Sequence, residues 1–149
     1  MDDIALSQGR PGIAEFIDLR RRTGWGAIDE ATARQTLAAT AFSVCLRQGQ
    51  RLVGFARVIG DGVLYFFLTD LVVDPAFRGG GHGDRLMQAI TDHFRQAAKP
   101  GATVTLIALA GREGFYERFG YVRCPDGPFG AGMRFAAAPP PAATNVDIR

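Results

Sequence analysis

The chain has 149 residues, of which 47% are hydrophobic and 21% charged, as expected for one globular domain with its own core. Its net charge is only +2 and its basic residues cluster only at Arg20–Arg22, so nucleic-acid binding is not expected. No apolar run is long enough to span a membrane, the acidic N-terminus does not resemble a signal peptide, and two cysteines provide neither a disulfide framework nor metal-ligand spacing. These features predict a cytoplasmic protein without membrane, nucleic-acid or metal partners.

The first 60 residues alternate short strands and helices with tight turns. Strands are expected where apolar residues alternate, and helices where they recur every three to four residues. Asp29 is placed to cap the second helix, and Gln48–Gln50 forms a hairpin turn between two strands. The predicted elements are, in chain order, a strand at 4–8, a helix at 12–22, a helix from 29 to about 39, a strand at 42–47 and a strand at 51–59.

The middle of the chain joins an apolar strand to an amphipathic helix through a glycine-rich segment. Residues 63–73 follow an Asp61-Gly62 turn and are apolar on both faces, which indicates a central strand buried on both sides. Beyond the glycines, Leu86, Ile90 and Phe94 recur on one face of a helix that ends near residues 99–101.

The last third contains shorter elements and a proline-rich end. The sequence predicts a strand at 103–110, a short helix at 113–119 and two closing strands at Tyr121–Cys124 and Met133–Phe135. Residues 139–149, which begin with three prolines, contain little that could pack, so they are predicted to form a tail. Residues 1–138 are therefore expected to form a single α+β domain with a mixed sheet.

The segment from Arg78 to Gly83 is typical of a phosphate-binding loop. Glycines let the backbone come close to a ligand, and the first N–H groups of the following helix have no partners within the helix. The helix dipole adds partial positive charge at the same place. The spacing excludes a P-loop, because no Lys follows the glycines, and it excludes a Rossmann fingerprint, because the third glycine is missing.

The spacing does fit R-x-x-G-x-G, as Arg78, Gly81 and Gly83, preceded by Val73-Asp74-Pro75. This arrangement resembles motif A of the GNAT superfamily of acetyl-CoA-dependent N-acetyltransferases. About 35 residues later, the run Phe115 to Tyr121 resembles that family's F-Y-x-x-x-G-[FY] motif. The resemblance implies the GNAT fold, a twisted, mostly antiparallel sheet flanked by helices, and transfer of acetyl from acetyl-CoA to a small primary amine.

The resemblance also assigns the residues that hold the cosubstrate. The pyrophosphate of coenzyme A is expected on a loop whose backbone N–H groups, with the Arg side chain, would bind it; these residues are Arg78, Gly79, Gly80, Gly81, His82, Gly83 and Asp84. Asp84 suits the helix dipole but is an unfavourable neighbour for a pyrophosphate. The backbone of Leu71, Val72 and Val73 is expected to face the pantetheine arm at a strand bulge and to supply an oxyanion donor. The Asn that many family members carry before the tyrosine motif has no equivalent in Leu109 to Arg112.

Two residues are candidates for the chemistry. Tyr116 matches the family tyrosine that donates a proton to the departing thiolate, with a packing role as the alternative. Asp70 is a carboxylate inside an apolar run, which could orient or deprotonate the amine or could be buried and satisfied by backbone donors. Trp25, Arg57 and Phe67 are the candidates for acceptor contacts.

Three other functions remain open at this point. One is an acyl-CoA-binding sensor without activity, the second is a protein lysine or N-terminal acetyltransferase, and the third is a nucleic-acid module. No Cys lies in the two motifs, so direct attack in a ternary complex is favoured over an acetyl-enzyme. Homodimers are frequent in this superfamily, although no feature of the sequence establishes one, and the sequence does not identify the acceptor amine.

Overall fold

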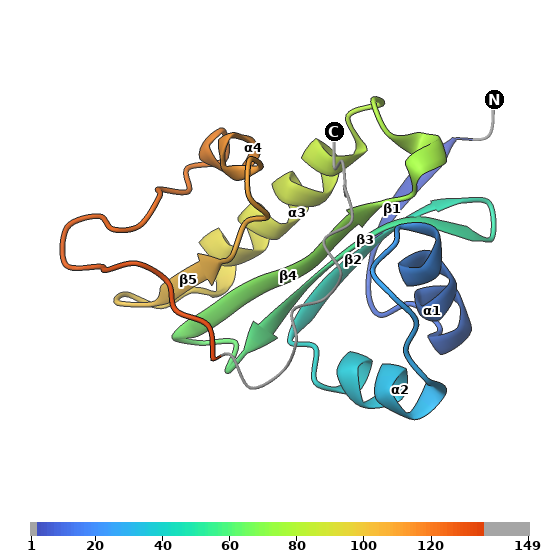
Figure 1. Ribbon diagram of the computed structural model, residues 1–149, viewed down its shortest axis with the longest axis horizontal. Helices are drawn as coiled ribbons and strands as arrows, with labels where there is room; N and C mark the ends of the chain where they lie inside the picture. The colour runs from blue at the N-terminus through green and yellow to red at the C-terminus, as the bar shows by residue number, and fades with distance from the viewer. Residues whose placement is uncertain (1–2, 136–149) are drawn as a thin grey trace.

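A computed structural model describes residues 3–135 as a five-stranded sheet with helices on both faces (Figure 1). The strands β1 to β4 form an antiparallel meander in chain order, and β5 lies parallel to β4 at the edge of the sheet. This confirms the mixed, mostly antiparallel α+β sheet. The strand bounds are β1 (Ile4–Gln8), β2 (Phe42–Gln48), β3 (Arg51–Gly60), β4 (Tyr65–Val73) and β5 (Thr103–Leu106).

The helices cover the two faces unequally. The pair α1 (Ile13–Arg22) and α2 (Glu30–Ala38) covers one face, and the long α3 (His82–Ala97) crosses the other (Figure 1). Phe55 of β3 meets Phe16 of α1 with ring centroids 5.6 Å apart, whereas Phe66 of β4 meets Phe94 of α3 at 5.4 Å. Two short helices, η1 (Pro75–Phe77) and α4 (Glu113–Glu117), follow β4 and β5 respectively.

The start of α2 and the buried face of α3 agree with the sequence prediction. The Asp29 side chain caps α2 by accepting a hydrogen bond from the Thr32 N–H at 2.7 Å. The apolar face predicted for α3 is buried, since Leu86 and Ile90 are fully covered and Phe94 nearly so. Burying apolar surface stabilises the folded state by about 25 cal/mol per Å². This face is therefore the main attachment of α3 to the sheet.

The C-terminal part differs from the prediction. The strand expected at 103–110 ends at Leu106, and neither Tyr121–Cys124 nor Met133–Phe135 forms a strand. A closing strand must pair along the outer edge of β5 and bury one of its faces, but Met133 and Phe135 are 93% and 88% exposed. Residues 122–135 are exposed throughout and contain only an isolated bridge between Asp126 and Phe129.

The predicted tail at 139–149, and with it the domain boundary at residue 138, lies outside the described residues. Within residues 3–135, no helix is long and apolar enough to cross a membrane.

Candidate active site

A β-bulge interrupts β4 at Asp70. The pairing with β3 shifts from Phe55↔Val72 to Arg57↔Thr69, so Asp70 and Leu71 together oppose a single residue of β3. Asp70 has φ of 52°, and it is the one non-glycine residue with positive φ in the described part of the chain. A non-glycine residue in this region is strained and persists only where its surroundings hold it, which is common at functional sites.

Next to the bulge, β4 parts from β5. The parallel pairing runs from Tyr65↔Thr103 to Leu68↔Leu106 and stops there, because β5 ends. On that side, residues 69–73 of β4 have no strand partner among residues 3–135. The bulge and the parting strands therefore leave the backbone of Leu71 to Val73 beside an opening, where the resemblance predicts the pantetheine arm.

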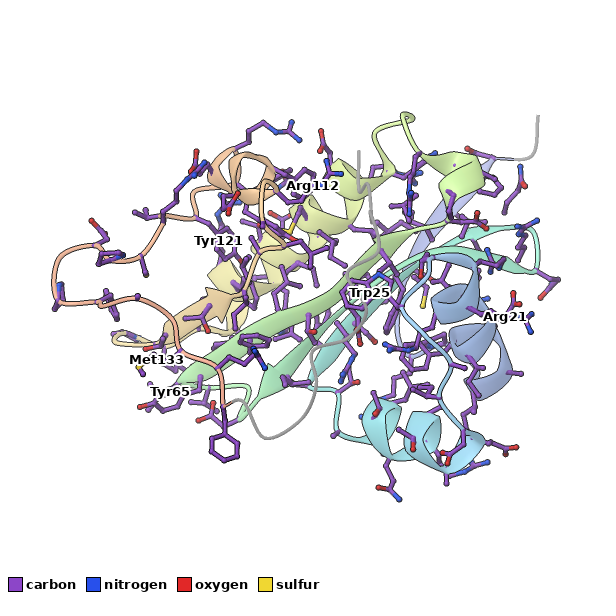
Figure 2. The ribbon with its side chains drawn as sticks, in the orientation of Figure 1. Arg21, Trp25, Tyr65, Arg112, Tyr121 and Met133 are labelled. Carbon is purple, nitrogen blue, oxygen red and sulfur yellow. The ribbon has the colours of Figure 1, made fainter. Side chains whose placement is uncertain are left out.

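A pocket of about 210 Å³ lies at this opening. It brings together five residues that the sequence singles out: Trp25, Phe67, Asp70, Leu71 and Tyr116. Trp25 reaches it from the connection between α1 and α2, and Arg112 lies beside α4 (Figure 2). The remaining lining residues, which sequence reasoning missed, are Leu68, Thr69, Leu106, Ile107, Leu109 and Arg112.

Of the missed residues, Arg112 left a signal in the sequence. It is a charged residue in the stretch Leu109 to Arg112, where the resemblance implies a pantetheine contact, and it lines the pocket. The sequence gives no sign that Ile107 and Leu109 line a pocket, because apolar residues directly after a strand are predicted to continue that strand.

Two arginines hold the Asp70 carboxylate. The Arg57 Nε atom donates to Asp70 Oδ2 at 2.5 Å, and Arg20 Nη1 lies 3.6 Å from Oδ1. The Asp70 side chain is only 10% exposed, so both guanidinium groups compensate a buried charge. Arg57 is not among the residues that line the pocket, and its pairing with Asp70 accounts for a charge in an apolar strand.

Tyr116 lines the pocket from α4 and packs against aromatic neighbours. Its ring lies edge-on to Phe115, with centroids 5.1 Å apart, and near Tyr121 at 6.2 Å. Burial raises the pKa of the Tyr116 phenol to about 12. The phenol therefore stays protonated at neutral pH, where it can donate a hydrogen bond or a proton.

The glycine loop has the backbone that an anion site requires. Gly79 and Gly81 have φ of 83° and 74°, and Gly81 is the N-cap of α3. A Cβ at either position would meet nothing within 4 Å, so the loop borders open space. The Arg85 N–H donates to the Gly81 carbonyl at 3.2 Å and begins the hydrogen bonding of α3. The N–H groups of the first turn before it have no partner within the helix. Coenzyme A pyrophosphate fits this arrangement, because the free N–H groups and the helix dipole both favour an anion.

Two side chains of this loop have partners of their own. Arg78 donates from Nε to the Val73 carbonyl at 3.2 Å, which ties the loop to the end of β4. Burial, with a smaller effect of the nearby Arg85 charge, lowers the pKa of His82, so its imidazole is neutral at pH 7. Residues 3–135 contain no group of three or more side chains that could hold a metal ion.

The fold and the site together are those of the GNAT type, and the comparisons with known proteins agree. The family model described as "Acetyltransferase (GNAT) domain" matches residues 20–137. The chain belongs to this family.

Several known proteins are similar. An uncharacterized N-acetyltransferase ycf52 from Porphyra purpurea is 38% identical over 52% of this chain and 43% of its own length. The protein of the same name from Pyropia yezoensis is 29% identical over 84% of this chain and 74% of its own. The chain thus spans less than half the length of the first of these relatives.

Two solved structures show the same architecture. Protein SA2161 of meticillin-resistant Staphylococcus aureus, described as a probable acetyltransferase, is 25% identical with a TM-score of 0.78, covering 89% of this chain and 100% of that one. A GNAT family acetyltransferase from Brucella melitensis, solved in complex with acetyl-CoA, is 20% identical with a TM-score of 0.60, covering 92% and 99%.

Proposed function

We propose that this protein transfers the acetyl group of acetyl-CoA to a small primary amine by direct attack in a ternary complex. The observation that carries the proposal is the pocket at the parting of β4 and β5, where Tyr116, Asp70 and the bulge at Leu71 face one space. A glycine-rich loop, which would suit a phosphate, opens α3, the helix that follows the same strand. The complex of the Brucella melitensis protein with acetyl-CoA supports the choice of cosubstrate.

The proposed cosubstrate site runs from the glycine loop to the bulge. The N–H groups from Gly79 to Asp84 would bind the pyrophosphate, with Arg78 adding charge. The backbone of Leu71, Val72 and Val73 would then guide the pantetheine arm toward the pocket, as the opening beside residues 69–73 allows. One of these N–H groups would face the thioester oxygen and stabilise the charge that develops on it.

The proposed reaction divides the proton transfers between two side chains. The amine nitrogen attacks the thioester carbon, a C–N bond forms and the C–S bond breaks. Asp70, paired with Arg57 and Arg20, would orient the amine, whose proton would pass to Asp70 or through water to solvent. Tyr116 would give a proton to the departing thiolate and recover one from solvent.

The pocket walls indicate the acceptor. Trp25 and Phe67 provide aromatic surface, and Ile107 and Leu109 add apolar surface. A slot of this kind favours a small amine with an apolar body over a polyamine, because most of its lining is apolar or aromatic. A peptide substrate would need a wider polar groove. A cytoplasmic location remains a prediction.

The test is a screen of primary amines with acetyl-CoA, reading the release of free thiol and the mass of the acetylated product. Arylalkyl and alkyl amines should turn over faster than polyamines and amino sugars. If no amine turns over while acetyl-CoA still binds, the protein is an acyl-CoA-binding sensor. Preferred acetylation of peptides would instead identify a protein acetyltransferase.

A further inference from the structure

The first turn of α3 is joined to α4 by an ion pair. Arg118, the C-cap residue of α4, donates from Nη2 to Asp84 Oδ1 at 2.7 Å and from Nη1 to Oδ2 at 3.2 Å. Two parallel hydrogen bonds between a guanidinium and a carboxylate fix a direction as well as a distance. The pair spans 34 residues of sequence and connects two elements that carry different parts of the site.

Arg118 is also held by two aromatic residues in and just after α4. Its guanidinium carbon lies 5.3 Å from the Phe115 ring centre and 5.5 Å from that of Phe119. Phe115 in turn packs edge-on to Tyr116. A continuous series of contacts therefore runs from the Asp84 carboxylate to the phenol in the pocket. The apolar contacts of Phe115 and Phe119 hold α4 on the core, but apolar burial has no direction, whereas the bidentate pair does.

Asp84 lies beside the proposed pyrophosphate site. It is three residues beyond the N-cap Gly81, where a carboxylate faces the free N–H groups and would repel a bound anion. Arg118 compensates that charge and draws the carboxylate toward α4. The conflict between an acidic residue and a phosphate loop, visible in the sequence, is thus reduced by a residue from a distant segment.

We propose that Asp84 and Arg118 are a positioning pair that fixes Tyr116 relative to the pyrophosphate loop. The proposal rests on the acetyl transfer proposed above. The loop that would bind coenzyme A is then fixed relative to the Tyr116 phenol, which would give its proton to the departing thiolate. Neither member of the pair touches the reacting atoms.

The test separates the two effects of the pair at low ionic strength, where exposed charges act most strongly. Asp84→Asn removes repulsion at the loop and also releases α4, so the Kd and KM for acetyl-CoA should fall about twofold while kcat falls about fivefold. Arg118→Gln leaves Asp84 uncompensated, so kcat should fall by a similar factor while the Kd for acetyl-CoA rises. Exchanging the two residues, Asp84→Arg with Arg118→Asp, should restore part of kcat, because the ion pair re-forms while the contacts of Arg118 with Phe115 and Phe119 are lost.

Arg123→Gln is the matched control. Arg123 follows α4 and pairs with Glu117 of that helix, so its ion pair does not connect α4 to α3. The substitution should leave kcat and the Kd unchanged. The proposal is overturned if Asp84→Asn and Arg118→Gln leave kcat unchanged, or if Arg123→Gln lowers it equally.

Hydrogen exchange of residues 113–120 gives a reading that does not need turnover. Acetyl-CoA should slow exchange there in the wild-type protein and slow it less in Asp84→Asn and Arg118→Gln. Equal slowing in all three proteins would overturn the proposed role of the pair. Absence of turnover in the wild-type protein would contradict the proposed function separately.

Discussion

At the scale of single residues, the phenol of Tyr116 is the group most open to test. Tyr116→Phe keeps the ring and its packing against Phe115 while removing only the hydroxyl. Fold and acetyl-CoA affinity should persist, and kcat should fall by about 10²-fold, the usual range for loss of a general acid. Because the pKa of this phenol is about 12, the loss should be nearly constant between pH 6 and 9. Steady-state kinetics across that range measures it.

Tyr121→Phe is the matched control for this variant. Tyr121 lies near Tyr116, its hydroxyl is buried without a hydrogen-bond partner, and it does not line the pocket. Its removal should leave the rate unchanged. An unchanged rate for Tyr116→Phe, with chemistry shown to be the slow step, would remove Tyr116 from the mechanism.

The glycine loop allows a second test at residue scale. Gly81→Val should abolish acetyl-CoA binding, because its side chain would enter the open space beside the free N–H groups. Valine is also strained at a φ of 74°, so the variant should lose about 1 kcal/mol or more of stability. Calorimetric titration with acetyl-CoA and thermal denaturation measure the two effects.

Gly49→Val separates strain from binding. Gly49 has φ of 56° at the tip of the β2–β3 hairpin, and a Cβ there also meets nothing within 4 Å. The control should be destabilised like Gly81→Val but should bind acetyl-CoA normally. Equal binding by both variants would move the pyrophosphate away from this loop.

At the scale of elements, the sequence predicts what local chemistry determines. Asp29 caps α2 because its short side chain reaches the Thr32 N–H, an interaction contained within four residues. The apolar spacing of Leu86, Ile90 and Phe94 places α3 correctly, because only one face of a helix can meet the sheet. The strand, loop and helix around Gly81 were predictable for the same reason.

Elements that depend on a distant neighbour were not predictable. The strand at 103–110 was predicted too long, because β5 ends where β4 bulges away at Asp70 and no pattern in 107–110 records that. The closing strands at 121–124 and 133–135 were wrong, since apolar residues there do not ensure a sheet edge to pair with. Arg57 likewise stands out in the sequence as a charge in an apolar strand. Its partner Asp70 cannot be identified from the sequence, because the contact depends on how β3 and β4 pair.

The packing of α3 on the sheet should make stability depend on pH. His93 stacks on Phe42 with centroids 3.7 Å apart, and burial lowers the pKa of its imidazole from 6.5. The unfolded chain therefore binds more protons than the folded one as the pH falls through about 6.5. Stability should decrease on acidification below that value and be fully present above it.

His93→Gln should flatten this dependence between pH 7 and 5, as measured by thermal denaturation in buffers of matched ionic strength. His82, whose pKa is also lowered, should account for part of the remaining slope. An equally steep decrease in the His93→Gln variant would show that other groups, rather than this stacked imidazole, control acid stability.

At the scale of the whole molecule, the proposed cosubstrate site joins parts that are far apart in sequence. The bulge of β4, the connection between α1 and α2 and the short α4 border one pocket, and the loop that opens α3 follows the end of β4 (Figures 1 and 2). The sheet offers no strand to close that opening within residues 3–135. A ligand lying between β4 and β5 would therefore supply contacts that the protein alone lacks at this place.

Acetyl-CoA should accordingly stabilise the protein as a whole against heat. A ligand at 100 times its Kd that binds only the folded state adds about 2.7 kcal/mol to the free energy of unfolding. For a domain of this size, that corresponds to a rise in Tm of roughly 5–10 °C, measurable by differential scanning calorimetry. S-acetylpantetheine, which keeps the thioester and the arm but lacks the pyrophosphate, should give a much smaller rise at equal concentration, because it cannot use the N–H groups of the glycine loop. In Gly81→Val the acetyl-CoA shift should shrink to that of S-acetylpantetheine, and in Gly49→Val it should remain. No shift in the wild-type protein at millimolar acetyl-CoA would contradict the cosubstrate assignment, and equal shifts from the two ligands would contradict the role of the loop.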